Sequence, residues 1–128
     1  MTNVLEVFVQ EVMKGGTVKW ESGTNKVQSS IQVVCCCVDA PARAAVLNQK
    51  QYNGYNGCSF CLHQGKRNNN SVKYIVPEDG DQPDERGTSE VMKDMSAALS
   101  TSQIQRGVRG YTPLVLLPKF DLVWGVVP

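Results

Sequence analysis

The feature that most constrains this chain is an apolar run from Val33 to Val38 that ends in one carboxylate, Asp39. The run has the length and composition of a buried β-strand, and Pro41 stops the strand two residues after the acid. A short helix-like segment, 42–47, follows. Catalytic acids often sit at strand ends, so the run predicts a strand-borne acid. An aspartate in this position is, however, more often a turn or cap residue.

A glycine-punctuated turn after that helix presents Cys58, Cys61 and His63 together. The two-residue gap between the cysteines lets both thiolates bind one tetrahedral zinc ion, and His63 is close enough to add a third ligand. Zinc prefers four ligands, and the chain has 1 histidine, so a closed site needs a further cysteine or residues outside this sequence. Two other interpretations stay open. One is a redox pair, which the helix-breaking residues after Cys61 disfavour, and the other is a pair of idle thiols.

The remaining cysteines predict a reducing environment. The chain has 5 in all, an odd number, whereas a secreted disulfide framework normally pairs an even set. Cys35, Cys36 and Cys37 are consecutive, and neighbouring strand residues point to opposite faces, so the three cannot all meet one partner. We expect them to be small buried hydrophobic residues.

Length and charge limit the class of protein. At 128 residues and 14.1 kDa the chain fits one small domain, and a net charge of +1 gives no global argument for binding nucleic acid or membrane. No window approaches the roughly 20 consecutive apolar residues that a membrane helix needs. Glu6 and Glu11 interrupt what a signal peptide would keep apolar. We therefore expect a soluble, intracellular protein.

The first third of the chain predicts a helix and a hairpin. Apolar residues at helical spacing precede Gly15 and Gly16, where a helix C-cap would fall (Val4, Leu5, Phe8, Val12 and Met13). Residues 17–21 alternate and read as a strand. After a polar turn, we expect this strand to pair in an antiparallel hairpin with the run 31–38.

The rest of the chain predicts a loop, a helix and core segments. Residues 65–71 form a polar loop before a short strand at 72–76, and 77–87 is an exposed acidic loop. Thr88 or Ser89 would cap a helix with a buried stripe of Val91, Met92, Met95 and Leu99. The apolar C-terminal residues suit buried strands or core-packing segments. Because a domain rarely stops on so apolar a segment, we expect the chain to be part of a longer protein.

The residues around Asp39 and the C-x-x-C resemble one known family. The run VDAPARAAVLNQKQYNGYNGCSFCLHQG, 38–65, is similar to the segment of CACTA-type (En/Spm-like) transposases in which a D-x-P-A sequence precedes a C-x-x-C by about twenty residues. The flanks LEVFVQEVMKGGTVKW, 5–20, and GVRGYTPLVLLPKFDLVWGVVP, 107–128, also resemble that family. The similarity is most specific between Asp39 and His63 and weakest in the acidic loop.

The resemblance implies a nuclear, cut-and-paste DNA transposase with an RNase H-like catalytic core. Asp39 would be the second metal-binding aspartate of a DDE triad, and Cys58 and Cys61 would be zinc ligands completed by later histidines. The first aspartate of the triad lies upstream of this sequence, and the glutamate lies downstream. One carboxylate cannot hold the two Mg²⁺ ions of the intact enzyme, so the chain alone is expected to be inactive. The resemblance leaves room for an oligomer.

The expected fold is α/β: a partial RNase H-like core, with a few-stranded sheet and flanking helices, plus a small zinc-knuckle insertion. Residues 1–128 would form a single incomplete domain. Its parts are 1–47 with the helix, hairpin and Asp-bearing strand, 48–76 with the knuckle, and 77–128 with the acidic loop, second helix and apolar segments. The DNA partner would be the transposon ends, and candidate phosphate contacts are Arg43, Lys66, Arg67, Lys73, Arg106 and Arg109.

Two other classes of function remain open. The first is a non-catalytic, zinc-stabilised module that binds nucleic acid or protein, which would bind zinc without Mg²⁺-dependent nicking of DNA. The second is a thiol redox protein, which needs an exposed Cys58 of low pKa at a helix start and a reversible disulfide to Cys61.

Overall fold

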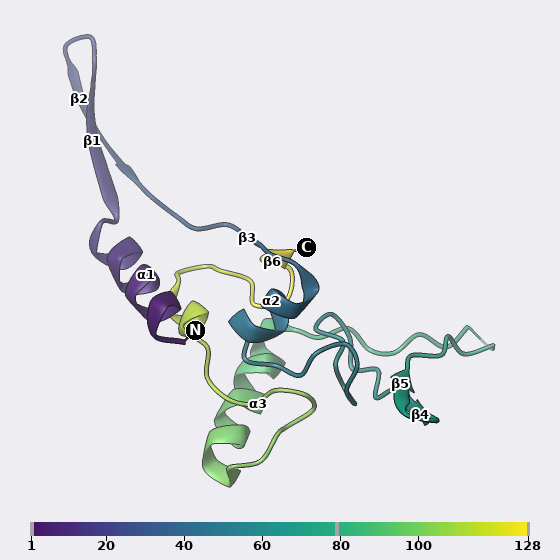
Figure 1. Cartoon of the computed structure of the whole chain (residues 1–128). Helices are drawn as coiled ribbons and strands as arrows, with labels where there is room; N and C mark the ends of the chain where they lie inside the picture. The colour runs from purple at the N-terminus through teal and green to yellow at the C-terminus, as the bar shows by residue number, and fades with distance from the viewer. Residues whose placement is uncertain (1, 79, 128) are drawn as a thin grey trace.

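The computed structural model describes residues 2–78 and 80–127, and within these ranges the fold is mixed α/β (Figure 1). Its helices are α1 (Thr2–Lys14), α2 (Ala40–Val46), α3 (Thr88–Thr101) and the short 3-10 helix η1 (Pro113–Leu116). Its strands form two-stranded sheets: β1 (Thr17–Ser22) with β2 (Asn25–Ser30), β3 (Cys36–Cys37) with β6 (Val126–Val127), and β4 (Lys66–Asn68) with β5 (Ser71–Lys73). No helix in the described ranges is long and apolar enough to cross a membrane.

Helix α1 confirms the first predicted element. It ends before Gly15, whose N–H donates to the carbonyl of Glu11 at 2.9 Å. One face packs on the core through fully buried Val9 and half-buried Leu5 and Val12, beside η1. Other residues of the predicted apolar pattern lie to either side of this face and are exposed (Val4, Phe8 and Met13).

The predicted hairpin partner was wrong. Strand β1 pairs antiparallel with β2, from Thr17 opposite Ser30 to Ser22 opposite Asn25, and not with the run 31–38. The turn needs only Gly23 and Thr24, with Gly23 at φ +62°, so the nearest downstream residues pair first. Figure 1 shows this hairpin standing away from the rest of the chain.

The apolar run was also predicted to be more regular and more buried than it is. Only Cys36 and Cys37 form a strand, β3, which pairs parallel with β6. Cys35 and Cys37 are exposed, and Cys36 is half-buried. Since β3 has one sheet neighbour and covers the core with one face, only alternate residues reach the interior. The expectation of three buried cysteines was therefore wrong.

Helix α3 is confirmed, but its cap and buried face differ from prediction. Gly87 is the N-cap, rather than Thr88 or Ser89, and the side chain of Glu90 accepts from its N–H at 3.2 Å. The buried residues are Val91, Asp94, Met95 and Ala98, whereas Met92 and Leu99 are exposed. The buried stripe is thus rotated toward Asp94 relative to the predicted one.

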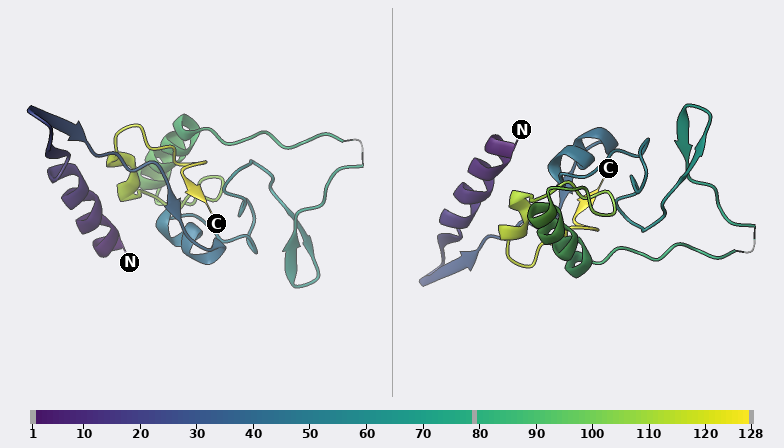
Figure 2. Two further views of the ribbon diagram at one scale, coloured as in Figure 1. Left: turned by 90° about the horizontal axis from the view of Figure 1, so that it is seen from above. Right: turned by 90° about the horizontal axis from the view of Figure 1, so that it is seen from below.

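The apolar C-terminal segments supply much of the core, as predicted. They pack with α1, α2 and α3 around a single buried cluster (Leu114, Leu117, Phe120, Leu122, Val123 and Val126 with Val9, Leu47, Val91, Met95 and Val108). Two views in Figure 2 place the yellow C-terminal segment between α2 and α3. This cluster fixes the base from which the 48–65 loop extends.

The middle of the chain is a hairpin followed by a long loop. Residues predicted as polar loop form β4, and the expected strand 72–76 shortens to β5 with a turn at Asn69 and Asn70. Residues 80–85 are exposed, as predicted. Arg86, at the end of the same loop, is buried. The exposed loop therefore rejoins the body of the protein at Arg86.

Candidate metal-binding thiol site

The loop that carries the two cysteines is tied to the body by backbone hydrogen bonds. Lys50 N–H donates to the Gly107 carbonyl at 2.8 Å, and Asn56 N–H donates to the Gln64 carbonyl at 2.9 Å. A side chain at Gly57 would collide with the backbone of Gln51, so the turn immediately before Cys58 requires glycine.

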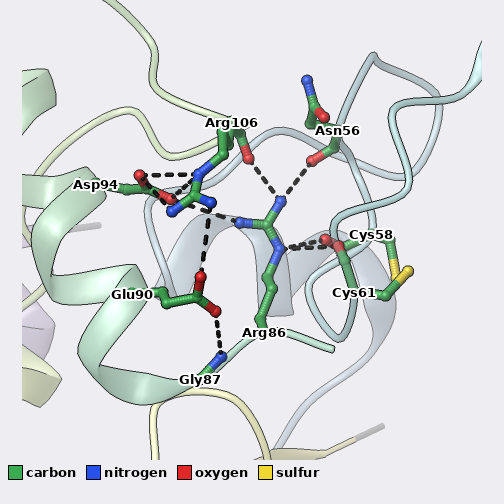
Figure 3. A network of polar contacts seen from close by, with 8 residues as sticks. All are labelled: Asn56, Cys58, Cys61, Arg86, Gly87, Glu90, Asp94 and Arg106. Carbon is green, nitrogen blue, oxygen red and sulfur yellow. Dashed lines mark hydrogen bonds and ion pairs between the residues drawn. The ribbon is translucent and has the colours of Figure 1, made fainter. Parts of the chain in front are cut away.

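Cys58 and Cys61 lie side by side, with both sulfurs on the same side of the loop (Figure 3). Both side chains line the same cavity. Both residues are half-buried. Burial, followed by the hydrogen bond with Cys58, raises the pKa of the Cys61 thiol. The structure therefore brings the two predicted thiols together at one place in the loop.

Arg86 braces this pair from the backbone side. Its Nε donates to the carbonyls of Cys58 and Cys61, at 3.0 Å each, and its Nη2 donates to the carbonyls of Asn56 at 3.4 Å and Arg106 at 2.6 Å (Figure 3). The side chain is 1% exposed. One guanidinium thus joins four backbone positions that surround the thiols, and its planar fork suits this geometry.

A carboxylate on α3 balances the charge of Arg86. Asp94 Oδ2 lies 4.0 Å from Arg86 Nη1, an ion-pair distance rather than a hydrogen bond. The same carboxylate binds Arg106, which also lies 3.7 Å from Glu90. Sequence reasoning missed Arg86, which stands in an acidic, polar loop without periodicity. For Asp94 a signal existed, because it falls within the i, i+3 and i+4 spacing of Val91 and Ala98.

His63 does not face an ion in this arrangement. Gly65 N–H donates to Nδ1 at 2.9 Å, and Nε2 lies 3.0 Å from the carbonyl oxygen of Ile75. An amide N–H can only donate and a carbonyl can only accept, so Nε2 carries the proton. Tyr74 packs edge-on against the ring, with centroids 5.2 Å apart. Both ring nitrogens thus contact backbone groups, and the role of His63 as a third zinc ligand stays a prediction.

A cavity of about 320 Å³ borders the thiols. Its walls are mostly apolar and include Ala40 and Ala44 of α2, both cysteines, Phe60 and Tyr74. Ala40 directly follows Asp39, so the acid-bearing start of α2 and the thiol pair meet at one hollow.

The carboxylates of Asp39, Asp94 and Asp121 do not form one metal-binding cluster. Asp39 is exposed, and its Oδ1 accepts from Ala42 N–H at 2.8 Å as the N-cap of α2, which confirms the cap interpretation. Asp121 directly precedes the turn at 122–124, and Asp94 is buried against Arg86 and Arg106. Within 2–78 and 80–127, no group of three or more His, Cys, Asp or Glu side chains could hold a metal ion. The thiols therefore supply half of a tetrahedral zinc site.

The predicted phosphate contacts fall into two groups. Arg43 is buried: Nε donates to Ser59 Oγ at 2.5 Å, Nη2 donates to the Val123 carbonyl at 2.6 Å, and the guanidinium lies 3.9 Å from the centre of the Phe60 ring. Arg106 is paired with Asp94 and Glu90. These two arginines make internal contacts. The other members of the set, Lys66, Arg67, Lys73 and Arg109, are exposed, and so is Arg106 outside its contacts with Asp94 and Glu90.

Comparison with models of known protein families, with curated proteins and with solved structures finds no match to this chain.

Proposed function

We propose that this chain is part of the catalytic domain of a cut-and-paste DNA transposase of the DDE type, as the CACTA resemblance implies. The observation that carries the proposal is that helix α2, which begins directly after Asp39, lines one cavity together with the C-x-x-C, through Ala40, Cys58 and Cys61. Asp39 follows β3, a strand with a parallel neighbour, so its exposed carboxylate stands at the carboxyl end of a parallel pair. Such ends are common places for catalytic groups in α/β sheets.

In this proposal β3 and β6 belong to an RNase H-like core, and residues outside this sequence supply the other carboxylates. Two metal ions stabilise the attacking and leaving oxygens in this class of reaction. Asp39 alone cannot hold both ions. The chain by itself is therefore inactive, and the intact enzyme acts on transposon ends in the nucleus.

Cys58 and Cys61 are the proposed zinc ligands, with two further ligands from outside the described residues. Their sulfurs on the same side of the loop (Figure 3) support this role, because two thiolates separated by two residues can bind one tetrahedral ion. The His63 ring keeps its backbone partners in this proposal. Exposed Lys66, Arg67 and Arg109 are the proposed phosphate contacts.

The zinc assignment is tested by metal analysis of the reduced, purified chain. We expect zinc to be bound by the wild-type chain and by Cys36→Ser, and to be lost in Cys58→Ser and Cys61→Ser. Zinc in none of these proteins, or equal zinc in all four, would contradict the site.

The catalytic assignment is tested in a polypeptide extended by the flanking coding sequence. We expect Mg²⁺-dependent nicking of DNA that carries the transposon ends, abolished by Asp39→Asn and unaffected by Asp81→Asn in the exposed loop. Unchanged cleavage by Asp39→Asn would overturn the assignment. So would flanking sequence without an upstream aspartate and a downstream glutamate.

A second candidate is a non-catalytic, zinc-stabilised module that binds nucleic acid. The exposed β4 to β5 hairpin favours it, because Lys66, Arg67 and Lys73 gather their charges on a short projecting element (Figure 2). This function predicts zinc and DNA binding by the present chain, with affinity that falls as salt rises and no cleavage by the extended polypeptide.

A further inference from the structure

The cavity beside the thiols has features that the transposase proposal does not use. Its volume, about 320 Å³, is at the lower end of the range for small-molecule sites in proteins. Of its lining residues, that proposal assigns a role to Cys58 and Cys61 alone. The apolar part of the remaining walls comes from helix α2 and from two aromatic residues (Ala40, Ala44, Phe60 and Tyr74).

Neighbouring groups hold both aromatic rings of the wall in place. The hydroxyl of Tyr74 accepts from the Gly57 N–H. The Phe60 ring contacts the guanidinium of Arg43, 3.9 Å from the ring centre, and the Trp124 ring, with centroids 5.0 Å apart. A preformed aromatic wall binds a flat apolar group without the entropic cost of ordering its own side chains. The cavity is therefore suited to an aromatic ring.

Arg43 places a buried positive charge in the wall of the cavity. The residue is 4% exposed, and its Nε and Nη2 donate to Ser59 and to the Val123 carbonyl. Its Nη1 is buried and has no hydrogen-bond partner within 2–78 and 80–127. Within the same ranges Arg43 forms no ion pair. Because a buried charge without a counter-ion is unfavourable, an anion bound nearby would stabilise this guanidinium.

Lys50 is a second cation at the same cavity. It is half-buried, lines the cavity and forms no ion pair with a residue that the structure describes. No aspartate or glutamate of the described chain is among the lining residues. Asp39, which directly precedes Ala40, is exposed and caps α2 instead. The charges of Arg43 and Lys50 thus meet no carboxylate of this chain at the cavity.

We propose that this cavity binds a small aromatic monocarboxylate, with its ring against the apolar walls and its carboxylate at Lys50. The ammonium of Lys50 matches a single negative charge, and the uncompensated charge of Arg43 adds to the attraction in a wall of low dielectric constant. Binding is non-covalent, so no bond forms or breaks. The proposal goes beyond the transposase function and does not depend on zinc.

The first test is calorimetric titration of the reduced chain, freed of metal by a chelator, with phenylacetate and with its neutral amide, phenylacetamide. We expect phenylacetate to bind at one site and the amide to bind about tenfold more weakly, because the amide loses the ion pair with Lys50. Since the chain carries no metal, the result is independent of the zinc assignment. This comparison uses the wild-type chain alone, so it tests the role of charge without any variant.

Two pairs of variants then locate the site. Lys50→Gln removes the cation, and Ala40→Leu adds bulk to the wall, so each should weaken phenylacetate binding about tenfold. Lys93→Gln on α3 and Ala45→Leu on α2 are the matched controls and should bind as the wild type does, because neither residue lines this cavity. Circular dichroism confirms that each variant is folded. No saturable binding of phenylacetate, equal affinity for the amide, or equal losses in the controls would overturn the proposal.

Discussion

The carboxylate of Asp94 binds the guanidinium of Arg106 at two nitrogens. Arg106 Nε lies 3.1 and 3.0 Å from the two oxygens, and Nη2 lies 3.0 Å from Oδ1. Arg86 approaches the same carboxylate, so one acid on α3 neutralises two arginines. Since Arg86 also binds the carbonyls of both cysteines, the position of the thiol pair depends on a charge that is remote from it in sequence.

We predict that Asp94→Asn lowers the free energy of unfolding by about 3 kcal/mol, because it leaves buried Arg86 without its counter-ion. Arg86 should then shift, and Cys58 and Cys61 should react faster with a disulfide reagent such as DTNB. Denaturant unfolding and thiol kinetics measure the two effects. Lys93→Gln, an exposed change on the same helix, is the control and should alter neither. Wild-type stability in Asp94→Asn would show that the acid is dispensable.

Substitutions of Asp39 can distinguish its structural role as a helix cap from its proposed catalytic role. Its carboxylate accepts the Ala42 N–H, and asparagine caps helices about as well as aspartate does. Asp39→Ala should therefore cost about 1 kcal/mol of unfolding free energy, whereas Asp39→Asn should cost a few tenths. Chemical denaturation of both variants measures the difference. Equal losses would mean that the cap bond contributes little and that charge dominates.

Local patterns in the sequence were enough to predict the helices. They did not predict which strands pair when the partners are far apart in the sequence. Helices α1 and α2 follow from apolar spacing, from glycine and from proline, all of which act within a few residues. The partner of β3 could not be found in this way, because β6 lies at the other end of the chain and is 2 residues long. The prediction that Cys35, Cys36 and Cys37 are all buried was wrong for the same reason. Burial of a strand residue depends on how many strands pack beside it, which local sequence does not reveal.

The same distinction between local and long-range contacts applies to the candidate site. The spacing of Cys58 and Cys61 was enough to predict that their thiols would lie together. The role of His63 was not predictable from its position, because Gly65 and Ile75 compete for its ring through backbone groups. Arg43 and Arg106 were candidate phosphate contacts, yet their guanidinium groups bind partners within the chain. Arg43 donates to Ser59 and Val123, and Arg106 donates to Asp94. Charge pattern alone carries no information on such partners.

The hydrogen bonds of His63 predict its tautomer. Nε2 should carry the proton of the neutral ring, and long-range ¹H–¹⁵N correlation spectra of the reduced chain distinguish the two nitrogens. Zinc addition should leave this pattern unchanged, and His63→Gln should keep the zinc of the wild-type chain. A shift of either ring nitrogen on zinc binding would instead make the ring a ligand and would require the bonds to Gly65 or Ile75 to break.

Asp121 makes the stability of the C-terminal turn depend on pH. Backbone N–H groups of Trp124 and Val123 and the hydroxyl of Thr88 donate to its carboxylate and hold its pKa below the ordinary value. A depressed folded-state pKa stabilises the protein above the unfolded-state pKa, and this contribution disappears as pH falls through the folded-state value.

We therefore expect Asp121→Asn, which keeps an acceptor but removes the charge, to destabilise the chain near neutral pH. The difference from wild type should shrink below about pH 4, where the carboxyl group of the unfolded chain is protonated. Solvent screening of this exposed group keeps the effect small, at most about 1 kcal/mol. Urea unfolding at a series of pH values measures it, with Asp81→Asn in the exposed loop as the matched control. A constant difference at all pH values would assign the effect to hydrogen-bond geometry rather than to charge.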